Sequence, residues 1–111
     1  MVGNLFIAKI YFTDISSYKE RPVLIIKELK DQDYLFLPLT TNLNQDGICI
    51  QPGDLDSGKL KKISMVIISK ISIIHRSLII RHLGSLKPDA LKSIKLGLCK
   101  SFDCYNENMN K

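Results

Sequence analysis

Residues 62–86 read KISMVIISKISIIHRSLIIRHLGSL, and this stretch indicates the fold class. It is rich in isoleucine, a residue that favours strands, and Ser, Lys, His or Arg interrupts the apolar runs every few residues. The pattern predicts short strands over residues 64–69, 70–74 and 77–81. Its longest apolar part, residues 63–74, contains three serines and a lysine and is shorter than the ~18–20 residues of a membrane-spanning helix. The N-terminus also lacks the features of a signal peptide, so we expect a cytoplasmic protein that has no contact with a membrane.

Shorter apolar runs upstream extend the strand pattern. They lie at residues 5–12, 22–26, 34–39 and 47–50, and polar segments such as TDISSYKE and QPGDLDSG separate them. Pro38 falls inside one run and predicts an edge position or a bulge, since proline has no N–H to donate to a neighbouring strand. Many short strands with frequent turns are typical of a small, twisted β-barrel.

The hydrophobic period changes after residue 87. Pro88 suits the first position of a helix, and Asp89 suits the positive potential of its first turn. Apolar side chains then recur at helical spacing, at Ala90, Leu91, Ile94, Leu98 and Phe102. This pattern predicts one amphipathic helix of three to four turns, in which Gly97 costs about 1 kcal/mol and permits close packing. The 111 residues therefore predict a single domain, mainly β with a C-terminal helix, with its core at residues 3–102 and a flexible tail at 103–111.

Charge is distributed unevenly along the chain, whose net charge is +5. Residues 1–56 carry five basic and eight acidic side chains, whereas residues 57–88 carry seven basic side chains and no acidic one. An acid-free segment of this length indicates a surface for a polyanion, although a solvated face is the plainer alternative.

The remaining composition excludes several classes of protein. The three cysteines, Cys49, Cys99 and Cys104, form no CxxC pair, so we expect free thiols in a reducing compartment and no zinc site. No glycine-rich phosphate loop, HExxH motif, calcium loop or nucleophile elbow is present. We therefore expect no cofactor and no bound metal.

Six short motifs in order resemble the MazF/PemK toxins of bacterial type II toxin–antitoxin systems. The resemblance runs from YFTDISSYKERPVLII through YLFLPLTTN to KLKKISMVIISKISIIHRSLIIRHLGSL, and it covers the chain from Gly3 to about Leu98. The matching pieces are Gly3, Arg21-Pro22, Pro38-Leu39-Thr40, Lys62-Ile63-Ser64, Gly84-Ser85-Leu86 and the helix from Pro88. The resemblance implies a small SH3-like β-barrel of the MazF/CcdB/Kid type, which agrees with the strand pattern.

The resemblance also implies an activity. Such toxins cleave single-stranded RNA without a metal, through attack of the ribose 2′-hydroxyl on phosphorus, and leave 2′,3′-cyclic phosphate and 5′-hydroxyl ends. The family arginine matches Arg21 and the family threonine matches Thr40, so these two are the expected catalytic residues. A guanidinium is always charged and offers several donors to phosphate oxygens. A homodimer is implied, as is a cognate antitoxin protein, and contact with DNA is expected only through the complex with that antitoxin.

The identity of the general base is not settled, because the sequence departs from the family pattern at one position. Many members carry a glutamate five residues before the arginine, where this chain has Ser16. Glu20 is the nearest carboxylate, although adjacent residues on an extended segment point to opposite faces. His75 is the other candidate because histidine often serves as a general acid or base, but a structural role at a strand end is the plainer alternative.

Further polar residues next to the predicted strands are expected to contact RNA. They are Lys19, Thr41, Asn42, Lys59, Lys61, Lys62, Ser64 and Arg76. Each has a plainer alternative: the Thr40–Asn42 segment as a turn that bonds its own backbone, Ser64 as a strand-end cap, and the lysines as a solvated loop.

Two other functions remain open from the sequence. A CcdB-like toxin shares the barrel but acts on DNA gyrase without nuclease activity, and the polar C-terminal tail counts against it. A nucleic-acid-binding barrel without catalysis would use only the basic segment.

Overall fold

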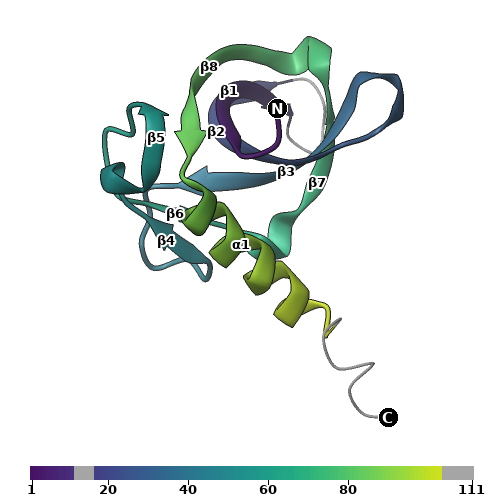
Figure 1. The fold of residues 1–111 in the computed structure, drawn as a ribbon. Helices are drawn as coiled ribbons and strands as arrows, with labels where there is room; N and C mark the ends of the chain where they lie inside the picture. The colour runs from purple at the N-terminus through teal and green to yellow at the C-terminus, as the bar shows by residue number, and fades with distance from the viewer. Residues whose placement is uncertain (12–16, 104–111) are drawn as a thin grey trace.

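The computed structural model describes residues 1–11 and 17–103. Phe12, Ser16 and all of the expected tail except Asp103 therefore lie outside the described residues. Figure 1 shows the elements of the described part. Eight strands and one α-helix are formed: β1 (Asn4–Tyr11), β2 (Tyr18–Glu28), β3 (Asp33–Thr40), β4 (Ile48–Ile50), β5 (Leu55–Gly58), β6 (Ser64–Val66), β7 (Ser72–His75), β8 (Ile79–Leu86) and α1 (Pro88–Ser101).

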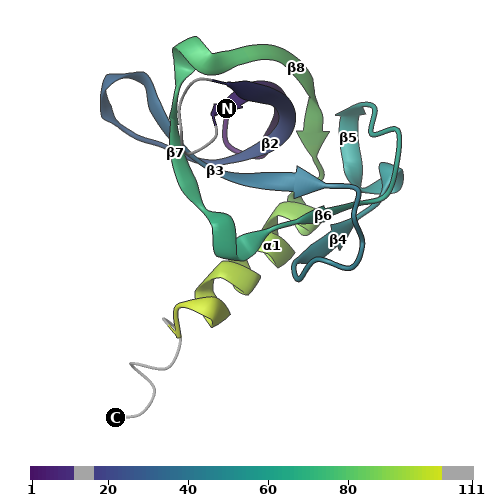
Figure 2. The same cartoon turned by 180° about the vertical axis from the view of Figure 1, so that it is seen from behind.

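The strands form one curled antiparallel sheet, in the order β4-β6-β3-β2-β1-β8-β5, with β7 also pairing with β3. Figures 1 and 2 show the sheet curling around β1 and β2, while α1 runs below it beside β4 and β6. The predicted fold class, mainly β with a C-terminal helix, is confirmed.

Strand alternation on β1 divides the interior into two hydrophobic clusters. Leu5 points into the larger cluster, which is closed by α1, and Phe6 and Ala8 point into the smaller one. Leu5 and its ladder partner Leu24 are both fully buried. Burial of a leucine contributes roughly 1.5–3 kcal/mol, so this rung anchors one end of the hairpin of β1 and β2.

The helix matches its prediction closely. It begins at Pro88 and ends at Ser101, and Ile94 is 0% exposed at its centre. A Cβ added at Gly97 would lie 2.4 Å from Ile48 Cδ1, which confirms the expected close packing against β4. Phe102 departs from the predicted apolar face and is 62% exposed, because it follows the last helical residue, where α1 has run past the sheet (Figure 1).

Two segments predicted as breaks are strands. Residues 55–58 form β5, which pairs with β8. Gly58 ends this strand with φ +80°, and a Cβ there would collide with the Leu83 carbonyl oxygen. Strand β2 begins at Tyr18 rather than Pro22, so Arg21 lies on a strand and pairs with Ala8. The reason is that ladder hydrogen bonds to β1 satisfy the polar segment's backbone without any apolar pattern.

Pro38 lies where β3 changes partners. Residues Asp33–Phe36 pair with β7, and residues Leu39 and Thr40 pair with β6. Pro38 falls in the gap between these ladders, where its missing N–H costs nothing, and its carbonyl accepts a hydrogen bond from Ile67 N.

The cysteine prediction is partly wrong. Cys49 is exposed with a free thiol, but Cys99 is disulfide-bonded. The sequence spacing carried no CxxC-type signal for this bond. Of the residues described, the α-helical ones form a segment too short and too polar to cross a bilayer.

We predict that Ile94→Ala destabilises the domain by about 2–5 kcal/mol, because it opens a cavity where α1 meets the larger cluster. Leu96→Ala is the matched control on the same helix, since Leu96 is 53% exposed, and we expect a loss below about 1 kcal/mol. Urea unfolding followed by circular dichroism measures both. Equal losses would contradict the docking of α1 through Ile94.

Candidate nucleic-acid interface

Two neighbouring hollows open on the surface beside the hairpin of β1 and β2. The larger, which we call the basic groove, has a volume of about 610 Å³. Its lining consists of Ile7, Pro22, Thr41, Lys59, Leu60, Lys61, Lys62, Ser64, Arg81, His82 and Leu83. The groove therefore has an apolar floor from β1 and β8 and a cationic rim from the loop between β5 and β6.

The second hollow, which we call the Arg21 pocket, has a volume of about 380 Å³. It is lined by Ile10, Arg21, Pro22, Pro38, Leu39, Thr40, Thr41, Gln45, Ile67 and Lys70. The two residues expected to be catalytic, Arg21 and Thr40, thus come together in one pocket although they are on different strands. Arg21 is held on β2 by its pairing with Ala8 of β1, and Thr40 is held on β3 by its pairing with Met65 of β6.

The two hollows meet along a shared rim made by Pro22 and Thr41. Ile7 lines the groove and Ile10 lines the pocket, and alternation places these two side chains on opposite faces of β1. The hollows therefore lie on either side of the hairpin, and a chain-like ligand can cross from one to the other over the rim.

Charge in the two linings is of one sign. Six cationic side chains line them: Arg21, Lys59, Lys61, Lys62, Lys70 and Arg81. Among the lining residues, which all belong to the described part of the chain, there is no carboxylate. Clefts lined by one sign of charge concentrate the field and attract ligands of opposite sign. The arrangement is therefore electrostatically complementary to a polyanion.

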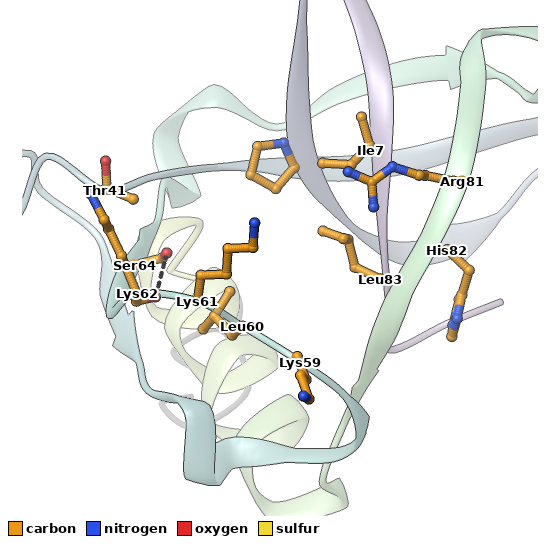
Figure 3. Close-up of a pocket in the computed structure, with 11 residues that line it drawn as sticks. Ile7, Thr41, Lys59, Leu60, Lys61, Lys62, Ser64, Arg81, His82 and Leu83 are labelled. Carbon is orange, nitrogen blue, oxygen red and sulfur yellow. Dashed lines mark hydrogen bonds between the residues drawn. The ribbon is translucent and has the colours of Figure 1, made fainter.

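Figure 3 shows how the cationic side chains of the basic groove are oriented. The Lys61 side chain extends into the hollow, Lys62 runs toward Thr41, and the Arg81 guanidinium lies beside Ile7. Lys59 turns its ammonium away from the floor. Lys61 and Arg81 are consequently the side chains that face a ligand inside the groove.

The threonine of the Arg21 pocket is held by its own turn. Thr40 Oγ1 accepts a hydrogen bond of 3.1 Å from Asn42 N, and Asn42 Oδ1 accepts one of 3.1 Å from Asn44 N. The turn interpretation of this segment is thus confirmed, and it is compatible with a role in the site. Since the Thr40 oxygen is used as an acceptor, its hydroxyl hydrogen is left to donate to a ligand oxygen.

Ser64 has a structural bond. It is 3% exposed, and its Oγ donates to the Lys62 carbonyl over 3.1 Å. This bond fixes the chain between Lys62 and β6 and so sets where the lysines leave the sheet. The strand-end alternative is confirmed for Ser64, which also lines the basic groove.

The structure places the two candidate bases differently. Glu20 is next to Arg21 on β2 and pairs with Lys9, on the opposite face of the strand from Arg21. His75 pairs with Asp33 at the start of β3, seven residues from Thr40, which corresponds to roughly 23 Å of strand. Its Nδ1 accepts a hydrogen bond from Ser77 N over 3.1 Å and caps the turn at Arg76–Leu78. His75 and Arg76 are therefore remote from the Arg21 pocket, and Lys19 and Asn42 line neither hollow.

Sequence reasoning missed two cations that the fold brings in. Lys70 enters the Arg21 pocket from the turn after β6, and Arg81 enters the basic groove from β8. Both belong to the acid-free segment of residues 57–88, so charge patterning was the available signal. It did not distinguish them from the other basic residues of that segment.

Comparisons with known proteins agree with this geometry. The family model for the PemK-like, MazF-like toxin of type II toxin–antitoxin systems matches residues 4–102. A mycobacterial endoribonuclease solved in complex with its cognate antitoxin is similar in fold, with a TM-score of 0.69 and 17% identity over 93% of this chain and 92% of that chain. The Mycobacterium tuberculosis toxin MazF-mt6 has a TM-score of 0.69 and 21% identity over 90% of this chain and 96% of that chain. No curated protein sequence matches this chain.

We predict that Lys61→Ala weakens binding of a single-stranded RNA and flattens its salt dependence. Each phosphate contact to a single strand contributes a slope of about −0.7 in log K against log salt concentration, so one lost contact should change the slope by about 0.7. Lys27→Ala, an exposed lysine on β2 that lines neither hollow, should keep the wild-type slope. Fluorescence anisotropy across a salt series measures this, and identical slopes for both variants would contradict the groove assignment.

Proposed function

Because the chain belongs to the PemK-like, MazF-like family of toxins of type II toxin–antitoxin systems, we propose that it is an endoribonuclease that cuts single-stranded RNA. The observation that carries the proposal is the meeting of Arg21 and Thr40 in one pocket, beside a groove whose lining includes four cations and no carboxylate. A strand of RNA would lie in the basic groove, cross the rim at Pro22 and Thr41, and present one phosphate to the Arg21 pocket.

The proposed reaction is transfer of the phosphorus to the neighbouring ribose oxygen. The 2′-hydroxyl loses its proton and attacks phosphorus, the bond to the 5′-oxygen breaks, and that oxygen takes up a proton. The products are a 2′,3′-cyclic phosphate and a 5′-hydroxyl. Negative charge builds on the two non-bridging oxygens during attack, and donors aimed at those oxygens lower the barrier.

Arg21, Thr40 and Lys70 are the proposed donors. The guanidinium of Arg21 offers two parallel N–H groups, the Thr40 hydroxyl donates from an oxygen fixed by its turn, and Lys70 adds a positive charge to the same lining. Hard cations such as Mg²⁺ need oxygen ligands, and a cationic lining does not suit them. These donors support a reaction that proceeds without a metal.

We further propose a partner and an assembly. The relative described above was solved with its cognate antitoxin. For this chain we propose a cognate antitoxin with an acidic segment, because such a segment would neutralise the same cations that hold RNA. We also propose a homodimer in the cytoplasm, inhibition of translation through cleavage of mRNA, and contact with DNA only through the antitoxin complex.

Arg21→Ala and Thr40→Ala should each lower the cleavage rate of a long unstructured RNA by about 100- to 1000-fold, because each removes one donor to the charged transition state. Affinity for RNA should change far less, since the other cations remain. Cleavage is followed in EDTA by primer extension and end-group analysis, with Lys27→Ala as the control. Intact RNA with the wild-type protein would favour a binding-only or gyrase-directed protein instead.

We retain Glu20 as the proposed base, acting from the groove side of the rim, because it shares a face of β2 with Pro22, whereas His75 is at the other end of β3. Glu20→Gln should lower the cleavage rate by about 100-fold or more, as expected for loss of a general base. His75→Gln should cut RNA at close to the wild-type rate. A loss confined to His75→Gln would reverse the assignment.

A further inference from the structure

The rings of two exposed tyrosines contact each other in a tilted arrangement, with 54° between their planes, at the last rung of the ladder between β1 and β2. Tyr11 and Tyr18 are ladder partners, their ring centroids are 5.4 Å apart, and they are 44% and 43% exposed. Lys9 Nζ lies 4.9 Å from the centroid of the Tyr18 ring. We call these three residues the tyrosine platform.

Their exposure is not explained by packing. Both rings lie at the end of the ladder, beyond the residues of the two hydrophobic clusters. An aromatic side chain contributes most to stability when it is buried, so a paired and exposed set contributes little to the core. The contact with Lys9 nevertheless fixes the Tyr18 ring and reduces its freedom before any ligand arrives.

The platform faces the same side of the hairpin as the basic groove. Side chains at positions 7, 9 and 11 share one face of β1, and Pro22, Glu20 and Tyr18 are their ladder partners on β2. Ile7 and Pro22 line the basic groove. The four residue steps from Ile7 to Tyr11 span about 13 Å, so a few nucleotides of single strand can reach from the groove to the rings.

The rung between groove and platform carries no net charge. Lys9 and Glu20 are ladder partners, and their formal charges cancel. The net attraction of this rung for a phosphate is therefore small, and the two exposed tyrosine rings offer an uncharged surface to a base. Stacking of unpaired bases on aromatic side chains is a general mode of single-strand recognition and tolerates any base.

We propose that the tyrosine platform is a stacking site for one unpaired nucleobase of the RNA that occupies the basic groove. The proposal rests on the proposed function, because it assumes that the groove takes single-stranded RNA. It adds a contact that depends on the base and not on charge, at one end of the bound segment.

Binding of a non-cleavable RNA tests the proposal apart from catalysis. The probe is a single-stranded 2′-O-methyl RNA of about 12 nucleotides, which lacks the attacking hydroxyl, measured by anisotropy with the full chain. Tyr11→Ala and Tyr18→Ala should each weaken binding roughly 5- to 150-fold, the range observed for loss of one stacked base. Tyr18→Phe should bind within about twofold of wild type, since the ring is kept. Phe102→Ala is the matched control, because Phe102 is 62% exposed and follows α1.

Two further measurements separate stacking from charge and from misfolding. The salt slope of Tyr18→Ala should equal that of wild type, in contrast to Lys61→Ala. A series of probes carries one abasic residue, each at a different position. At one position the abasic residue should weaken binding to wild type but should cause no added loss of affinity in Tyr18→Ala. A double-mutant cycle quantifies this coupling. Thermal unfolding by circular dichroism confirms that each variant is folded.

The outcomes distinguish this proposal from the proposed function. Unchanged RNA affinity in both alanine variants overturns the platform, whether or not the wild type cuts RNA. A loss of affinity that is seen for the antitoxin and not for RNA also overturns it. An equal loss in Tyr18→Phe also overturns it. Wild-type protein that binds the probe through the rings but cuts no RNA supports the platform and contradicts the nuclease assignment. Absence of any binding by the wild type contradicts both.

Discussion

The antiparallel register of β1 against β2 is the constraint on which the rest of the structure depends. Leu5 and Leu24 form a fully buried rung at one end of this ladder, and Arg21 lies three residues along β2 from Leu24. A slip of one residue would move every side chain of β2 to the other face. Leucine would then leave the core, and Arg21 would leave its pocket. The burial that stabilises the sheet therefore also fixes the position of the candidate catalytic residue.

The clustered positive charges repel one another, and both solvent and a bound polyanion reduce that repulsion. Six cations line two adjoining hollows with no carboxylate among the lining residues, and like charges at this spacing repel one another. The side chains remain in water, where screening keeps the repulsion small. Binding of a polyanion removes the remaining repulsion and releases counterions. Under the proposed function, the same surface would accept RNA or an acidic segment of the antitoxin, and the two would compete.

Local patterns in the sequence carried much of the fold and part of the site. Helical spacing from Pro88 to Leu98 predicted α1, and short apolar runs between polar segments predicted β1, β3 and β6. The pieces Arg21-Pro22 and Pro38-Leu39-Thr40 pointed to a pair that shares a pocket. The polar start of β2 and the strand Leu55–Gly58 were missed, because long-range ladder bonds stabilise them and local propensity does not. Lys70 and Arg81 were missed because only the curl of the sheet brings them to the site.

By itself the sequence determined the class of structure, the terminal helix, the family and the location of excess positive charge, since these depend on composition, short-range spacing and motifs. Only the tertiary structure decided which side chains meet. It joined Arg21 to Thr40 and Lys70, placed His75 at the far end of β3, and set Tyr11 beside Tyr18 on the groove side. The physical reason is that strand pairing, register and sheet curvature are long-range properties. They arise from burial summed over the whole core, and no single segment encodes them.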